Sequence, residues 1–323
     1  MGSRRPKAGM PQGQCGQDVA VSNPTMPLLL LLLVALATGT VVTLAVWRYP
    51  DAPFVPTSPT ASAAVAVGHT LAHHSRLRRL LVGRLDPGVA TGLALTLALG
   101  AILLGGLLLA VLAYLVRSSD RLVEIDESVA EWGFAHASDL SDDGLHLVTT
   151  LGETWFVIVA AIVLVIVERR RGPWRWVALY LAVVIVGQNA LTRTIKELAD
   201  RVRPDLNPIA ETLGPSFPSG HSATAAAFWA AAALVLGRGR PRLTRALLAG
   251  GAVGITVAVA GSRVLLDVHW LSDVIAGVAL GWGWFAACSI AFGGRVLRFG
   301  AAAERAGERA VAEAGTPQGN EAA

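Results

Sequence analysis

The feature that most constrains the fold is a series of long apolar runs separated by shorter polar segments. A helix of about 20 mainly apolar residues crosses the hydrocarbon core of a bilayer. Seven runs approach this requirement, at residues 27–47, 88–116, 146–167, 174–195, 219–237, 246–264 and 272–292. The composition agrees, because 53% of the residues are hydrophobic and only 15% are charged, against about a quarter in a typical soluble domain. The sequence therefore predicts an all-α, polytopic membrane helical bundle.

Two of these runs differ from the others. The run at 27–47 ends in VWRYP, without the small-residue cleavage site that follows a signal peptide, so we expect an uncleaved anchor. The run at 146–167 is the weakest, since its uninterrupted part is short and begins only after Glu153. We expect Glu153 to lie at the outer interface, although it could instead approach the polar stretches described below.

Composition divides the chain into four parts. Residues 1–26 are polar and rich in Gly, Pro and Gln, and we expect a disordered leader. Residues 27–86 would form a membrane anchor followed by a basic linker, and residues 87–294 a core of six membrane helices. Residues 295–323 would form a cytoplasmic tail that is largely disordered.

The arginines predict how the chain is oriented in the membrane. They cluster at residues 168–176, at 238–245 and after Arg295, and two runs separate each cluster from the next. Short basic loops face the cytoplasm, so these clusters indicate membrane orientation better than nucleic-acid binding. Residues 117–145 carry eight acidic residues and two arginines, and we expect them outside. Seven spans would also put the N-terminus outside, unless the first run does not fully span.

Three polar stretches then lie on the outer face. The first contains Lys196 and, seven residues later, Arg203 followed by Pro204. Read alone, it is a helix end whose cations reach the interface. The second contains Ser219, Gly220 and His221 at the start of an apolar run. A helix N-terminus favours an anion, because its first N–H groups are unpaired and its dipole is positive there. Read alone, this stretch could be an ordinary helix cap.

The third stretch contains Arg263, His269 and Asp273. On a helix, His269 and Asp273 would share one face, and the carboxylate could orient the imidazole and stabilise its positive charge. A structural His–Asp pair at a helix start is the alternative. With Lys196 and Arg203, Arg263 completes a set of three cations, which is what phosphoryl transfer requires when no metal neutralises the phosphate.

No metal site or disulfide is expected. The cysteines Cys15 and Cys288 are far apart and in unlike surroundings, and no acidic cluster has the spacing of a metal site. Three linker histidines lie on the face opposite the polar stretches and are not expected to bind a metal: His69, His73 and His74.

The motifs Lys-x6-Arg-Pro, Pro-Ser-Gly-His and Ser-Arg-x5-His-x3-Asp, in this order, resemble the three signatures of the type 2 phosphatidic acid phosphatase family. Its superfamily also includes vanadium haloperoxidases and bacterial acid phosphatases. The resemblance covers residues 196–273 by motif and about 88–292 by a six-helix layout. The run at 27–47 lies outside it, and would be one additional transmembrane segment.

The resemblance implies a role for each motif residue. His269 would attack phosphorus and form a phosphohistidine, with Asp273 orienting it. His221 would protonate the leaving group and then help to activate water. The phosphate oxygens would be held without a metal or other cofactor by Lys196, Arg203, Ser219, Gly220 and Arg263.

The expected function is that of a bacterial integral membrane lipid phosphatase with its site on the extracytoplasmic side of the cell membrane. Its partners would be membrane lipids and no nucleic acid. Candidate substrates are undecaprenyl diphosphate, phosphatidylglycerol phosphate and phosphatidic acid, which the residues do not rank, and they do not indicate an oligomeric state. A vanadium-haloperoxidase-like enzyme is one alternative, disfavoured by the apolar runs. A non-catalytic lipid-binding or transport protein is another, and it would need neither both histidines nor Asp273.

Overall fold

The structure is a computed structural model that describes residues 25–48, 114, 118–136, 138–170, 174–204 and 214–296. Its helices are α1 (Met26–Arg48), α5 (Asp120–Ala135), α6 (Asp139–Thr149), the short 3-10 helix η1 (Thr150–Gly152), α7 (Thr154–Glu168), α8 (Trp174–Ala199), α9 (Gly220–Gly237), α10 (Arg242–Leu265) and α11 (Leu271–Val296). The part of the chain that is described contains no strand, so the all-α prediction is confirmed.

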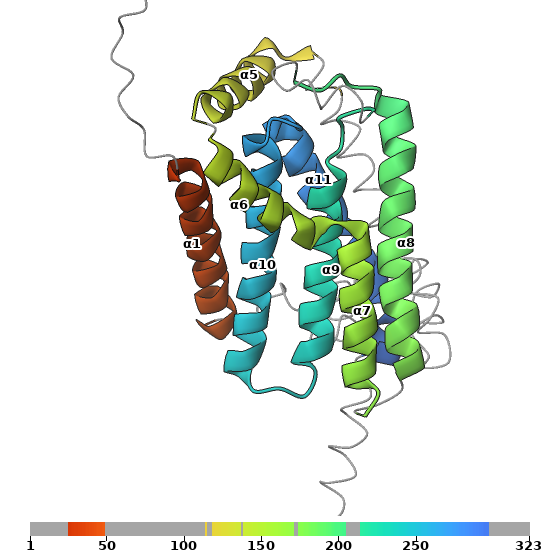
Figure 1. Ribbon diagram of the computed structural model, residues 1–323. Helices are drawn as coiled ribbons and strands as arrows, with labels where there is room; N and C mark the ends of the chain where they lie inside the picture. Colours follow the sequence, from red (N-terminus) through yellow and green to blue (C-terminus); the bar gives the residue numbers. More distant parts are fainter. Residues whose placement is uncertain are drawn as a thin grey trace, which may run out of the picture.

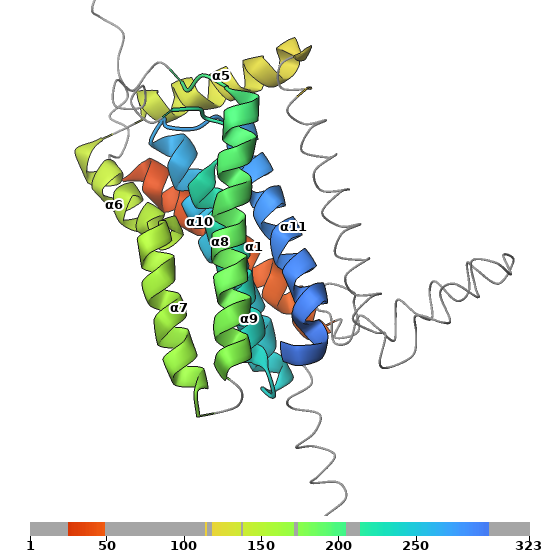
Figure 2. The ribbon, with the colours of Figure 1, turned by 90° about the vertical axis from the view of Figure 1, so that its right-hand side faces the viewer.

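The long helices run side by side as a bundle, and α5 lies across one end of it (Figures 1 and 2). Five of them, α1, α8, α9, α10 and α11, are long and apolar enough to cross a membrane, and the segment from α6 to α7 passes the same test as a bent pair, which is a broken span or a re-entrant loop. The multi-pass membrane architecture is therefore confirmed. The run expected at 88–116 falls almost entirely outside the described residues, as do the leader, the linker and the tail.

Helix α9 forms the centre of the bundle. Most of its alanines are buried, whereas α1 and α7 expose rows of large Leu, Val and Ile side chains on their outer faces. Small residues allow membrane helices to approach closely, and Gly277 and Gly281 place α11 directly against the backbone of α9. This packing brings the start of α11 to the start of α9.

The run at 146–167 is not one straight helix, because the chain breaks at η1 and α7 continues at an angle of 53° to the preceding segment. The break packs against α9. A Cβ atom on Gly152 would lie 2.8 Å from the carbonyl oxygen of His221, and the indole N–H of Trp229 donates to the carbonyl of Leu151 at 3.0 Å. The 117–145 segment, expected only as an acidic outer stretch, contains α5 and the first part of α6, which continues to Thr149.

Helix α1 packs along α10 in the antiparallel direction. Leu31 meets Gly261 near one end of the pair, and Gly39 meets Gly250 farther along it. The contact is a backbone approach, since a Cβ atom on Gly39 would lie 2.8 Å from the carbonyl oxygen of Gly250. The additional N-terminal segment is thus a docked member of the bundle, and α1 begins at the end of the bundle that α5 covers (Figure 1).

The two ends of the bundle differ. We call the end covered by α5 the site end, because α8 and α10 finish there and α9 and α11 begin there (Figure 1). At the opposite end, the basic end, Arg238 forms an ion pair with the buried Glu168 at 2.9 Å. The described residues of the basic clusters at 168–176 and 238–245 lie at the end away from the polar motifs.

Candidate active site

The three sequence motifs meet at the site end. Lys196 lies in the last turn of α8, Ser219 and His221 at the start of α9, Arg263 in the last turn of α10, and Asp273 in the first turn of α11. The second and third motifs are joined through the backbone, since the N–H of Ser219 donates to the carbonyl of Asp273 at 3.0 Å.

His269 lies in the loop between α10 and α11, which is buried against α1 and α6 through Leu266 and Val268. The chain turns at Asp267 with φ of 55°, a left-handed conformation that Asp tolerates better than most residues. His269 therefore precedes α11, so the expectation that it shares a helix face with Asp273 is wrong. The two residues meet across the start of the helix.

The His269–Asp273 pair is deeply buried, with 3% and 0% of the two side chains exposed. Its Nδ1–Oδ2 distance of 3.6 Å is within ion-pair range but too long for a hydrogen bond. The same Oδ2 accepts a hydrogen bond from the N–H of Trp270 at 3.1 Å. Burial lowers the pKa of His269 to about 4, although Asp273 acts in the opposite direction. The imidazole is therefore neutral at pH 7.

Arg203 lies beside the other ring nitrogen of His269, with 3.4 Å between Nη1 and Nε2. Its guanidinium is held by backbone carbonyls: Nη1 donates to Val268 and Nε donates to Gly214 at 2.9 Å. Burial lowers the pKa of Arg203 from its usual value. An arginine remains protonated under such conditions, so a partly desolvated cation faces the histidine.

The other two cations complete the surroundings. The Nζ atom of Lys196 donates to the carbonyl of Pro215 at 2.8 Å, and Nη1 of Arg263 donates to the hydroxyl of Thr149 at 3.2 Å. The Nε atom of Arg263 is buried without a partner in the described part of the chain. His221 interacts electrostatically with Lys196, Arg203, Arg263 and His269. Five motif side chains thus share one electropositive cluster.

Ser219 is the N-cap of α9, as expected, but its side chain does not cap the helix. Its hydroxyl accepts a hydrogen bond from that of Ser222 at 2.9 Å, and both residues are completely buried. With no side-chain cap, the N–H groups and positive dipole of the first turn point to the site end. Gly220 is the first residue of α9 and contributes only backbone there.

Sequence reasoning missed several residues that contact the site. Thr149 reaches Arg263 because of the break at η1. Glu153 was not missed: it is the N-cap of α7 and interacts electrostatically with Arg263, which agrees with the alternative that the sequence left open for it. Arg201 contacts Asp273 and the buried Asp126 at 2.6 and 2.8 Å. One signal was present for Asp126: it shares a helical face with the small residues Ala130 and Gly133, where an acidic residue is unusual.

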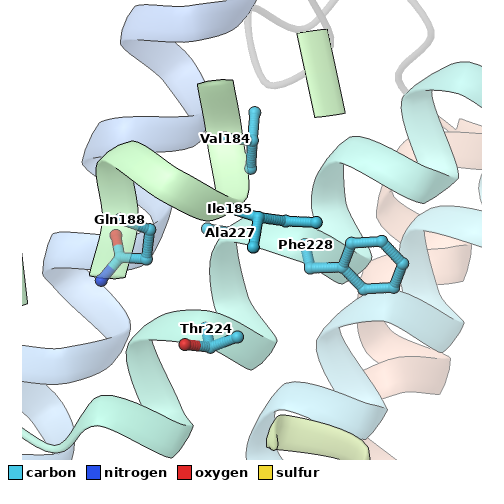
Figure 3. Close-up of a pocket in the computed structure, with 6 residues that line it drawn as sticks. All are labelled: Val184, Ile185, Gln188, Thr224, Ala227 and Phe228. Carbon is cyan, nitrogen blue, oxygen red and sulfur yellow. The ribbon is translucent and has the colours of Figure 1, made fainter. Parts of the chain in front are cut away.

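A small pocket lies deeper in the bundle, between α8 and α9, and contains none of the motif residues (Figure 3). It is lined by Val184, Ile185, Gln188, Thr224, Ala227 and Phe228. The amide nitrogen of Gln188 donates to Thr192 at 2.8 Å. Among the described residues, no group of three or more His, Cys, Asp or Glu side chains is arranged to hold a metal ion.

Comparison with known proteins identifies relatives over this region. The sequence model of the PAP2 superfamily matches residues 177–296. The chain is 34% identical to phosphatidylglycerophosphatase B of Bacillus subtilis over 110 residues, which are 33% of this chain and 53% of that protein. It is 36% identical to lipid A 1-phosphatase of Rhizobium etli over 120 residues, or 34% of this chain and 47% of that protein. The chain thus spans about half the length of these two relatives.

A third relative matches over more of its length. The chain is 35% identical to decaprenylphosphoryl-5-phosphoribose phosphatase of Mycobacterium tuberculosis over 153 residues, which are 46% of this chain and 73% of that protein. Among solved structures, the fold is similar to that of a transmembrane PAP2 type phosphatidylglycerolphosphate phosphatase from Bacillus subtilis. The TM-score is 0.54 at 27% identity, covering 61% of this chain and 98% of that one.

Proposed function

The chain belongs to the PAP2 superfamily, and from this premise we propose that it is an integral membrane phosphatase that hydrolyses a lipid phosphate or prenyl diphosphate. One observation carries the proposal: a buried, neutral histidine lies between a carboxylate, Asp273, and a guanidinium, Arg203. A neutral imidazole is a nucleophile, the guanidinium can hold a phosphate oxygen next to it, and the carboxylate stabilises the charge that develops on the ring.

In the proposed reaction, Nε2 of His269 attacks phosphorus while the bond to the leaving oxygen breaks. His221 gives its proton to that oxygen, and Arg203, Arg263 and Lys196 neutralise the charge on the phosphoryl oxygens. In the second step, water attacks the phosphohistidine, His221 takes a proton from that water, and His269 is released with inorganic phosphate. Asp273 stabilises the imidazolium in both steps. Three cations around a dianion remove the need for a metal ion.

The position of the cluster supports an amphiphilic substrate. The motif residues lie at or next to the ends of apolar helices, and a lipid whose tail stays in hydrocarbon would present its phosphate at such helix ends. The basic loops lie at the other end and are expected in the cytoplasm, so we place the site on the extracytoplasmic side of the cell membrane. Undecaprenyl diphosphate, phosphatidylglycerol phosphate and phosphatidic acid all meet this description. The named relatives also act on phosphorylated lipids.

The test is phosphate release by the purified protein in detergent with EDTA, using these three lipids as a panel. We expect turnover of at least one lipid, inhibition by vanadate, and a labelled intermediate that is acid-labile and base-stable. His269→Ala should lower kcat by on the order of 10⁴-fold, the usual cost of losing a group on which the mechanism depends. His146→Ala, at an exposed position on α6, is the matched control and should keep full activity. Normal turnover by His269→Ala would contradict the assignment of the nucleophile.

A further inference from the structure

A series of buried charged side chains leads from α5 to the candidate active site. Nη2 of Arg201 lies 2.8 Å from Oδ2 of Asp126, and Nη1 of the same guanidinium lies 2.6 Å from Oδ1 of Asp273. The two carboxylates are 3% and 0% exposed, and the arginine is 15% exposed. Arg201 therefore bridges a carboxylate on the covering helix and the carboxylate beside His269.

Both ends of this bridge are fixed. Asp126 accepts hydrogen bonds from the backbone N–H of Ser272 at 2.9 Å and from its hydroxyl, so α5 is attached to the first turn of α11. The guanidinium of Arg201 also lies over the ring of Trp270, with 5.5 Å between its carbon and the ring centroid. The planar guanidinium is thus bound by a carboxylate at each of two nitrogens and by an aromatic ring on one face, which leaves it little rotational freedom.

The bridge determines how the Asp273 carboxylate is turned. Oδ1 accepts from Arg201 at 2.6 Å, and Oδ2 accepts from the N–H of Trp270 at 3.1 Å. Oδ2 is also the atom that lies 3.6 Å from Nδ1 of His269. Rotation of the carboxylate would break both hydrogen bonds, so the oxygen facing the imidazole is held in place by Arg201 on the other side.

We propose that Arg201, held by Asp126, is a positioning residue that orients Asp273 toward His269 without contacting the phosphate. This inference rests on the proposed phosphatase function. Asp126 has a second role in it, because it compensates the charge of Arg201. A lone guanidinium would weaken the negative field that Asp273 exerts on His269, whereas the carboxylate–guanidinium–carboxylate series keeps a net negative charge next to the ring.

This electrostatic role predicts the direction in which the acid limb of the pH profile of kcat/KM moves in each variant. The charged groups that face His269 are Asp273 on α11, Arg203 after α8, Arg263 on α10 and, across the cluster, His221 on α9. Loss of the Arg201 charge would stabilise the imidazolium and move the acid limb of kcat/KM to higher pH. Loss of the Asp126 charge would destabilise the imidazolium and move the same limb to lower pH. The ionisation of the substrate is common to all variants and cancels in the comparison.

The experiment compares Arg201→Gln, Arg201→Lys and Asp126→Asn with wild type, in detergent, on whichever lipid of the panel is turned over. Because small displacements of catalytic groups cost about 100-fold, we expect Arg201→Gln to lower kcat by on the order of 100-fold. KM should change little, since no phosphate contact is lost. Arg201→Lys keeps the charge and should recover part of kcat, and Asp126→Asn should shift the acid limb opposite to Arg201→Gln.

The chain offers a matched control pair at the basic end. Arg238 and Glu168 form an ion pair of similar burial, 19% and 3% exposed, at 2.9 Å, far from the motif residues. Arg238→Gln and Glu168→Gln should lower thermal stability as much as the test variants do, with kcat and the pH profile unchanged.

The outcomes separate the two proposals. A wild-type protein that turns over no lipid contradicts the proposed function. An active wild type whose Arg201→Gln variant keeps kcat within about twofold, or raises KM instead of lowering kcat, overturns only the positioning role. If Arg201→Gln does not fold, Arg201→Lys and Asp126→Asn decide through their pH profiles: shifts in the same direction, or none, contradict the inference.

Discussion

The charge state of His269 is set by where the side chain lies, since burial lowers its pKa to about 4, against about 6.5 for an ordinary histidine. We therefore expect its ring ¹⁵N resonances in detergent to titrate with a midpoint near 4. His269→Gln should remove these resonances and so assign them. A midpoint at or above the ordinary value would contradict the burial described for this residue.

The sign of the linked stability effect follows from the same shift. Between pH 6.5 and pH 4, the unfolded chain binds a proton at His269 that the folded protein does not bind. The free energy of unfolding should therefore fall as the pH is lowered through this window, and His269→Gln should reduce that dependence.

The sequence indicated which residues come together at the candidate site more accurately than it indicated how those residues are arranged. Lys196, Arg203 and Arg263 were found because cations at helix ends are visible in the sequence. The His269–Asp273 pair was also found, but with a helical geometry that the loop before α11 does not have. Arg201 is a cation in the same stretch as Lys196 and Arg203, but its position in the sequence does not reveal the two carboxylates that it contacts. Its role depends on Asp126, 75 residues away, and only tertiary packing brings the two together.

At the scale of the helices, the contact between α1 and α10 leaves no room for a side chain. A Cβ atom on Gly250 would collide with the hydroxyl of Thr43 and the carbonyl of Gly39, whereas one on Gly251 would meet nothing within 4 Å. We expect Gly250→Ala to destabilise the protein by about 1–3 kcal/mol, the usual cost of overpacking. Gly251→Ala, one position along, should be neutral or slightly stabilising.

Thermal unfolding of the two variants in one detergent measures the difference. Equal melting temperatures for Gly250→Ala and wild type would mean that α1 does not pack on α10 as described. Phosphatase activity measured well below the melting temperature should be retained, because the contact lies away from the motif residues.

Helix bounds were predictable where apolar runs are continuous, since α8 to α11 begin and end within a few residues of the runs. The break at η1 was not predictable in this way. It exists because Gly152 packs on the carbonyl of His221 and Leu151 accepts from Trp229, and both partners lie in a helix about 70 residues further along the chain. Periodicity within a segment carries no information about such contacts.

At the scale of the whole molecule, the two ends of the bundle have different chemistry. Arg238 and its neighbours lie at the basic end, and every motif residue lies at the site end, where α1 also begins (Figure 1). A count of seven spans predicts that the N-terminus and the motif residues lie on the same side of the membrane, and the start of α1 at the site end agrees with that prediction.

The placement of every motif residue at one end of the bundle has a consequence for how lipid is consumed. In sealed vesicles that hold the protein in a single orientation, hydrolysis should stop once the substrate of one leaflet is exhausted, and detergent should release the remainder. Complete hydrolysis without detergent, in vesicles shown not to exchange lipid between leaflets, would contradict this expectation. If hydrolysis does stop in this way, the protein uses the substrate of one leaflet only. The rate at which phosphorylated lipid crosses to that leaflet would then limit the total amount hydrolysed.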